Sequence, residues 1–140
     1  MKNPRNATAL LLLLAACEKP VERSIDQVCK PENDQKQVVT EGHFALDKTM
    51  LCSNVSGTKR CGIRFESAPG KKDGLSADIV EGDGANQIEE VKGELNDAAI
   101  KIHTDDGKVI GVGAKAKISG KVGVGEKGVC YMYVNEIHAL

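Results

Sequence analysis

Five segments of this 140-residue chain alternate between apolar and polar side chains, the pattern of a β-strand that buries one face. They are Val38–Leu46, Cys61–Glu66, Ala99–Thr104, Ala114–Val124 and Val129–Ile137. Apolar residues make up 41% of the chain and its formal net charge is only −1, which indicates a folded rather than a disordered protein. Five strands, no long helical pattern and a length that suits one core predict a small five-stranded antiparallel β-barrel.

The alternation also assigns the faces of these strands. Gly42, in the middle of the first strand, predicts a bulge or a sharp bend. Arg64 and Glu66 are expected on the outer face of the second strand. Strict alternation along the last strand places Ile137 on the face opposite Val134. The fourth strand is expected to bury an apolar face and to expose a row of lysines, which is typical of sheet-edge protection.

The remaining segments carry weaker patterns. Val21–Cys29 has apolar residues at helical spacing and predicts a short helix. Ser67–Gly93 is rich in glycine and is expected to be mostly loop, with short strands at Leu75–Val80 and Gln87–Val91. Within it, Glu81–Asn86 is similar to a calcium-binding loop but lacks the alternating carboxylates and the distal glutamate. A flexible turn is therefore the favoured interpretation.

The first 16 residues have the layout of a secretory signal peptide. Lys2 and Arg5 form a basic region, and an apolar run from Ala9 to Ala16 follows and ends in small residues. The run is too short to span a membrane. Export to an oxidising compartment is therefore expected.

Leu14-Ala15-Ala16-Cys17 resembles the lipobox of bacterial lipoproteins. That resemblance implies that cleavage occurs before Cys17 and that Cys17 carries fatty acyl chains, including an S-linked acyl group such as palmitate. Several acyl chains anchor a protein stably to a membrane, whereas one chain binds only marginally. The alternative is an ordinary cleaved signal that leaves Cys17 as a free or disulfide-bonded thiol. The lipoprotein interpretation divides the chain into a signal peptide (1–16), a lipidated tether with a short cap (17–37) and a barrel (38–140).

The other four cysteines are an even number, as expected of disulfides in an exported protein. Four cysteines allow three pairings. Of these we predict the one with Cys52–Cys61, which brackets a turn between two antiparallel strands. The remaining pair, Cys29–Cys130, would tie the cap to the last strand and close a loop of about a hundred residues. Zinc is the competing ligand for four cysteines, but none of their spacings matches a zinc knuckle. No metal or other cofactor is therefore expected.

The stretch from residue 38 to residue 139 resembles the OB-fold domains of the tRNA-anti-like family, which are common in exported bacterial proteins. The resemblance rests on weak motifs in a specific order: Val39–Gly42, Leu51–Asn54, Ile102–Gly107, Gly113 with Ile118–Lys121, and Val134–Ile137. It implies an OB-fold-like barrel in which the first strand curls to pair with both of its neighbours. It implies fold much more than function.

Two function classes are disfavoured by composition. OB-folds that bind nucleic acid use basic grooves and stacked aromatic residues, but this chain is slightly acidic and has two Phe and two Tyr, with both Phe on expected core faces. No nucleophile–base set or carboxylate–arginine cluster indicates an enzyme. His43, His103 and His138 lie on three different strands and would hold zinc only if the barrel brought them together.

The function that remains is an exported, lipid-anchored binding module of the bacterial cell envelope, on a membrane and facing the periplasm or the exterior. Its partner would be a protein, a peptide, a glycan or another small ligand. The expected binding residues are Arg64, Lys101 and His103 on an outer face, beside the loop from Ser67 to Gly84. The alternative is a structural component of an envelope assembly, which a broad exposed apolar patch would favour and a concave pocket would disfavour.

Overall fold

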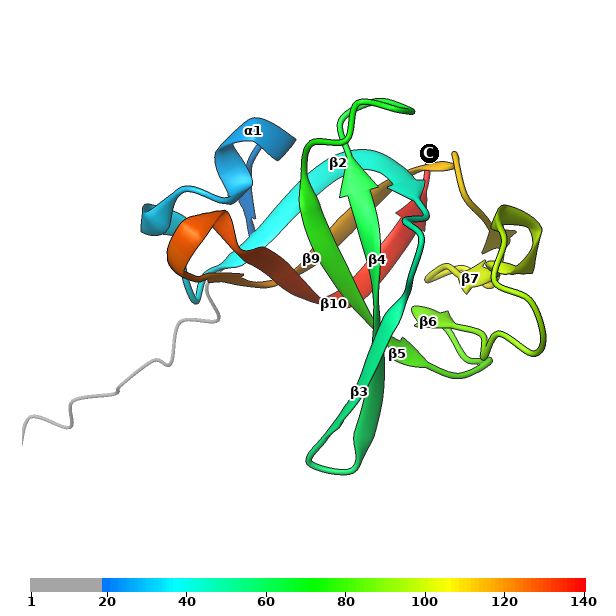
Figure 1. Cartoon of the computed structure of the whole chain (residues 1–140). Helices are drawn as coiled ribbons and strands as arrows, with labels where there is room; N and C mark the ends of the chain where they lie inside the picture. Colours follow the sequence, from blue (N-terminus) through cyan, green and yellow to red (C-terminus); the bar gives the residue numbers. More distant parts are fainter. Residues whose placement is uncertain (1–18) are drawn as a thin grey trace, which may run out of the picture.

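The computed structural model describes residues 19–140, so the signal peptide and Cys17 lie outside the described residues (Figure 1). The described part is mainly β. Its elements, in chain order, are β1 (Val21–Glu22), α1 (Ile25–Val28), η1 (Pro31–Asn33), β2 (Gln37–Ala45), β3 (Leu51–Val55), β4 (Thr58–Glu66), β5 (Leu75–Glu81), β6 (Gln87–Ile88), η2 (Asp97–Ala99), β7 (Ile102–His103), β8 (Val109–Ile110), β9 (Lys115–Val124), η3 (Glu126–Gly128) and β10 (Cys130–Ala139). Among these residues no helix is long and apolar enough to cross a membrane.

Five strands close a barrel in the order β2–β4–β5–β10–β9 and back to β2. This confirms the predicted five-stranded, OB-fold-like barrel. Four of the pairs are antiparallel, and the β5–β10 pair is parallel. A closed ring with an odd number of strands cannot alternate direction at every pair, so an all-antiparallel barrel of five strands is geometrically impossible. The parallel pair is the one departure from the antiparallel expectation.

Strand β2 closes the barrel by pairing with two neighbours in succession. Residues 37–43 pair with β9, and residues 43–45 pair with β4. Gly42 lies where the partner changes, and a Cβ there would lie 2.6 Å from the carbonyl oxygen of Glu66 and 2.8 Å from the Phe65 ring. Figure 1 shows β2 curving over the top of the barrel. Glycine allows this close approach because it carries no side chain.

The core consists of the inward-facing side chains of the five barrel strands and of the cap. Phe44 and Phe65 pack edge to face with ring centroids 5.0 Å apart, and both are essentially inaccessible to solvent. Val122 is also fully buried, as the alternation on β9 predicts. From the cap, Ile25 and Val28 belong to the same cluster, so the cap and the barrel share one core.

The predicted strand assignments need one exchange. Leu75–Glu81, expected as a short strand within a loop, is the barrel strand β5 and pairs with both β4 and β10. Ala99–Thr104, expected as a principal strand, contains only the two-residue strand β7, preceded by the 3₁₀ turn η2. The alternation of β5 is weak because the inward residue Ala77 is small and Val80, which is not buried, is apolar. Local periodicity therefore predicted the wrong one of these two segments as a principal strand of the barrel.

Two face assignments were wrong. Ile137 is fully buried like Val134, because the β9–β10 register shifts between Val134 and Glu136 and the extra residue, Asn135, forms a β-bulge. Glu66 is 3% exposed rather than outward-facing. Its carboxylate accepts hydrogen bonds from the backbone N–H groups of Gly70 and Lys72, at 2.8 and 3.0 Å, and thereby orders the loop after β4.

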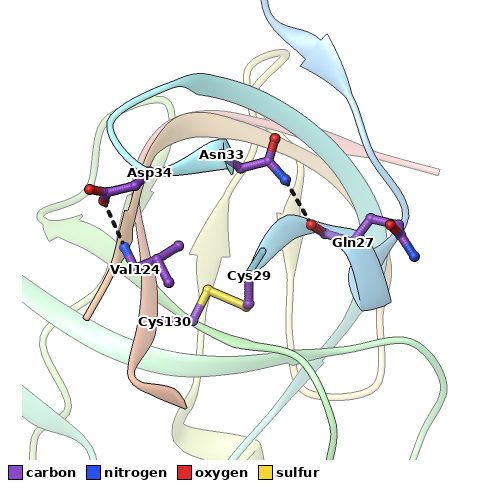
Figure 2. The surroundings of a disulfide bond; sticks show 6 residues. All are labelled: Gln27, Cys29, Asn33, Asp34, Val124 and Cys130. Atoms are coloured by element: carbon purple, nitrogen blue, oxygen red, sulfur yellow. Dashed lines mark hydrogen bonds between the residues drawn. A yellow bond between two sulfur atoms is a disulfide. The ribbon is translucent and has the colours of Figure 1, made fainter. Parts of the chain in front are cut away.

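The cap is shorter in helix than the sequence predicts. Only Ile25–Val28 is helical, whereas Val21–Glu22 forms β1 and pairs in parallel with β2. Figure 2 shows how the cap is fixed beyond the helix: the Cys29–Cys130 disulfide joins it to β10, and the Asp34 carboxylate accepts a 2.9 Å hydrogen bond from the Val124 N–H of β9. The β1–β2 pairing thus takes the place of the first turn of the predicted helix, and the disulfide and the Asp34 hydrogen bond hold the chain that follows the helix.

Candidate functional site

Both predicted disulfides form. Cys29 and Cys130 have their Cα atoms 5.6 Å apart, and Cys52 and Cys61 have theirs 4.0 Å apart. Cys52 and Cys61 are direct partners in the β3–β4 ladder, so the second bridge links two adjacent strands. Cys17 lies outside the described residues, and its lipidation stays a prediction.

The three expected binding residues lie in two separate places. Arg64, on β4, forms a bidentate ion pair with Asp47 and donates to the carbonyl oxygen of Lys72 at 2.8 Å. Lys101 lines a different hollow, and the His103 Nε2 lies 3.0 Å from the Glu89 carboxylate. The structure therefore does not gather Arg64, Lys101 and His103 around one pocket. Part of the Ser67–Gly84 loop expected beside them is the barrel strand β5.

A hollow of about 600 Å³ lies on the outer face of β3, β4 and β5. Its walls come from the loop after β2, which contributes Asp47, and from the end of the loop before β5, which contributes Lys72 and Asp73. Figure 1 shows the β3–β4 hairpin projecting beyond the barrel at one end of this face. Three cationic and three acidic side chains line the hollow, so it offers both donors and acceptors of hydrogen bonds.

Gly62 creates the floor of this hollow. A Cβ at Gly62 would lie 2.7 Å from Ser76 Oγ and 2.9 Å from Asp78 Oδ1 of the neighbouring strand β5. Without that Cβ, the Ser76 hydroxyl donates to the Asp78 carboxylate at 3.1 Å. Burial raises the pKa of Asp78, against the lowering effect of the Ser76 hydrogen bond and of the Arg60 charge. Asp78 is thus a partly desolvated carboxyl group in a recess, a feature that is frequent at functional sites.

Two tyrosines continue the same face onto β10. Tyr131 and Tyr133 pair with Ser76 and Asp78 across the parallel β5–β10 ladder, and their ring centroids lie 5.0 Å apart. Tyr133 is 39% exposed. Burial is the main cause of the raised pKa of Tyr131, and the neighbouring Tyr133 contributes. The two rings form an aromatic surface beside the recessed carboxyl group.

Arg60 of β4 connects the aromatic surface to the hollow. Its guanidinium carbon lies 5.1 Å from the centroid of the Tyr133 ring, within the range of a cation–π interaction. Its Nη1 donates to the backbone carbonyl of Asp78 at 3.3 Å. We define the β4–β5–β10 face as Arg60, Gly62 and Arg64 of β4, Ser76 and Asp78 of β5, and Tyr131 and Tyr133 of β10.

Sequence reasoning identified Arg64 on this face but missed Arg60 and Asp78. The alternation of β4 does place Arg60 with Arg64, and that signal was available. No local pattern reveals that Tyr133 lies beside Asp78, because their proximity depends on the parallel pairing of strands more than fifty residues apart.

The three histidines do not converge. His43 Nδ1 lies 3.1 Å from the carbonyl oxygen of Gly113, His103 pairs with Glu89, and His138 Nδ1 lies 3.1 Å from the Asp105 carboxylate. Each histidine thus has a separate protein partner, and a site formed by all three is not present in the described chain.

No family model, no curated protein and no solved structure matches this chain. The resemblance to the tRNA-anti-like family therefore stays a prediction, and the function is argued from the geometry of the site.

Proposed function

We propose that this protein is an exported, lipid-anchored binding module of the bacterial cell envelope, and that it binds its ligand on the β4–β5–β10 face. The observation that carries this proposal is the recess at Gly62, which contains a partly desolvated carboxyl group, Asp78. Tyr133 pairs with Asp78 on the neighbouring strand, and Arg60 lies over the exposed Tyr133 ring. Concave sites with a few convergent polar groups are the usual form of small-ligand sites.

The side chains of the β4–β5–β10 face indicate which chemical class of ligand it can bind. Arginine donors, carboxylate and hydroxyl acceptors and two aromatic rings suit a neutral or zwitterionic ligand that has both donors and acceptors and a flat or apolar surface. A peptide or a glycan has these properties. The balanced charge of the hollow gives no general attraction to a polyanion, which disfavours nucleic acid.

Two features support the export and anchoring part of the proposal. The N-terminal sequence ends its apolar run in Leu14-Ala15-Ala16-Cys17, and the four other cysteines form two disulfides. Disulfides persist mainly in oxidising compartments. The anchoring is tested by Cys17→Ser, which should abolish acylation and release the protein from the membrane pellet; a variant that still sediments with lipid at high salt would contradict the lipobox.

The binding proposal is tested by cross-linking the full-length protein in its own envelope and identifying what is attached. Arg60→Glu with Asp78→Ala should abolish the cross-linked species, because both changes alter the recess. Lys115→Glu is the matched control, since Lys115 is exposed on β9 outside this face. A species lost in the control as well, or retained in the double variant, would contradict binding at the β4–β5–β10 face.

The alternative, a structural component of an envelope assembly, has one observation in its favour. Leu51 and Val55, the first and last residues of β3, are 79% and 52% exposed. An apolar hairpin side of this kind suits a protein contact. In the cross-linking experiment, attachment that is lost in Val55→Ser but retained in Arg60→Glu would favour this second function, because Val55 does not line the hollow that contains Arg60.

A further inference from the structure

We propose that Asp83, Glu89 and His103 form a binding site for a divalent transition-metal ion, with Zn²⁺ as the best-suited cation. One carboxylate oxygen of Asp83, one of Glu89 and one ring nitrogen of His103 all lie within 4.8 Å of one another. This site is separate from the β4–β5–β10 face and does not rest on the proposed function.

The three ligands are held by three different parts of the chain. Asp83 lies in the turn between β5 and β6, Glu89 directly follows β6, and His103 ends β7. The Gly82 N–H donates to the Ile88 carbonyl at 2.8 Å, and the Glu89 N–H donates to the Lys101 carbonyl at 2.9 Å. These backbone hydrogen bonds fix the positions from which the side chains converge, as a preorganised site requires.

The distances fit a metal ion after a small adjustment. Zn²⁺ binds nitrogen and oxygen at about 2.0 to 2.2 Å, so two ligand atoms of a tetrahedral site lie about 3.3 Å apart. His103 Nε2 and Glu89 Oε2 are already 3.0 Å apart. Asp83 is exposed, so its carboxylate can move closer to the Glu89 and His103 ligand atoms without disturbing the core. The donor set of one imidazole and two carboxylates leaves the fourth position open to water or to an anionic ligand.

The electrostatics of the cluster favour a cation. Two carboxylates share one histidine, so the group carries an excess of negative charge. Lys92 and Lys101 line the hollow beside Asp83 and Glu89, but within residues 19–140 neither lysine forms an ion pair with these carboxylates. A divalent ion would bind both carboxylates and the imidazole at once. The imidazole favours a transition metal over Ca²⁺ or Mg²⁺, which prefer oxygen ligands only.

One ligand of this site, Asp83, lies in the stretch for which the sequence favours a flexible turn. The Glu81–Asn86 stretch lacks the pattern of a calcium loop, and the structure shows why a linear motif is absent. Within Glu81–Asn86, only Asp83 belongs to the cluster; Glu89 directly follows β6, and His103 ends β7. The fold, rather than a continuous loop sequence, brings the three ligands together.

The test is a zinc titration by calorimetry of the full chain with both disulfides intact, in a Cys17→Ser background without a histidine tag. This background removes the free thiol, because the other four cysteines are bridged. We expect one zinc ion per chain. His103→Ala and Glu89→Gln should each weaken binding by about tenfold or more, the scale on which disturbed metal sites lose affinity.

Two matched controls are available in the same chain. His138→Ala removes a histidine that also pairs with an aspartate, and Glu90→Gln removes a carboxylate that lines the same hollow as Glu89. Both should leave zinc binding unchanged. His103→Gln, which retains a polar side chain, is the second variant if His103→Ala does not fold. Zinc should raise the melting temperature of the parent and not of the His103 variants.

The proposal is overturned if the parent binds no zinc, if zinc binding survives the His103 and Glu89 changes, or if His138→Ala weakens binding equally. The proposal is also overturned if calcium binds as tightly as zinc and its binding does not depend on His103. That result would mean that the carboxylates alone attract cations.

Discussion

The closed barrel and the segment between β5 and β9, residues 82–114, are built on different principles. The barrel strands have seven to ten residues each, and their inward side chains are almost completely buried. The strands β6, β7 and β8 of the segment have two residues each. Residues 82–114 lack long apolar alternation, so turns and polar contacts hold this segment in place. The proposed metal site lies among these polar contacts.

The segment still has an anchor in the core. Ile88, Ile100 and Ile102 are buried with the barrel residues. At the β10 bulge, the Ile137 N–H donates to the Asn86 side-chain oxygen at 2.8 Å, and the Asp105 N–H donates to the Ile137 carbonyl at 2.7 Å. We therefore expect the barrel to carry the global stability, and the segment to open locally at lower cost.

The largest expected effect is in the barrel. Val122→Asp places an unpaired charge at a fully buried position and removes a buried valine, so it should lower the free energy of unfolding by about 5 kcal/mol or more. Urea unfolding followed by circular dichroism measures this change. Lys121→Asp, at the adjacent exposed position, is the control and should have a small effect. An unchanged stability in Val122→Asp would show that the two faces of β9 are reversed.

The two disulfides should differ in the stability that they contribute. Cys29–Cys130 joins residues 101 apart, and Cys52–Cys61 joins residues 9 apart. The chain-entropy model gives about 4.7 kcal/mol for the long loop and about 2.6 kcal/mol for the short one. Double Cys→Ser variants, compared by urea unfolding, should preserve that order. The loop closed by Cys29–Cys130 encloses residues 82–114, but neither bridge is attached to a residue of that segment. Local opening of the segment, measured by amide exchange, should therefore change less than that of the barrel. A reversed order would mean that strain or residual structure outweighs loop entropy.

The same division explains what could be predicted from the sequence. Four of the five barrel strands, the buried face of β9 and the Cys52–Cys61 bridge could be predicted from local spacing. The Cys29–Cys130 bridge was predicted as the remaining pair of an even number of cysteines, because its two residues are 101 positions apart. The β5 segment was predicted only as a short strand within a loop, because the small Ala77 and the outward apolar Val80 weaken its alternation. The neighbours Tyr133 and Asp78, and the cluster of Asp83, Glu89 and His103, depend on strand order and on turns. Local periodicity contains no information on either.

A smaller effect is expected where the segment meets the barrel. Asn86 has a φ of 61°, so Asn86→Gly retains the left-handed conformation and removes only the side-chain oxygen that accepts from Ile137. The Ile137 N–H would lose its partner, at a cost of about 1 to 2 kcal/mol. Hydrogen exchange should show faster opening of residues 82–114 and little change in β2 and β9. Uniformly faster exchange would show that the segment and the barrel unfold as one unit.

The smallest effect is a pair of opposite pH dependences. Burial raises the pKa of Asp78 in the barrel, whereas the Thr104 hydroxyl, which donates to Asp106 at 2.5 Å, lowers the pKa of Asp106 in the segment. A raised carboxyl pKa destabilises the fold at neutral pH, and this cost disappears as the pH falls through the raised pKa towards the ordinary value of 3.8. A lowered pKa contributes stability above 3.8 that is lost as the pH falls below it.

Asp78→Asn should therefore have a higher free energy of unfolding than the parent at pH 7, and this difference should disappear in acid. Asp106→Asn should be less stable than the parent at pH 7 and approach it in acid. Urea unfolding of both variants between pH 7 and pH 3 measures the difference. The two curves should converge on the parent from opposite sides, because one carboxyl group is desolvated by the barrel wall and the other is exposed beside a hydroxyl donor. Parallel curves would mean that the barrel wall and the segment present the same electrostatic environment to a carboxyl group.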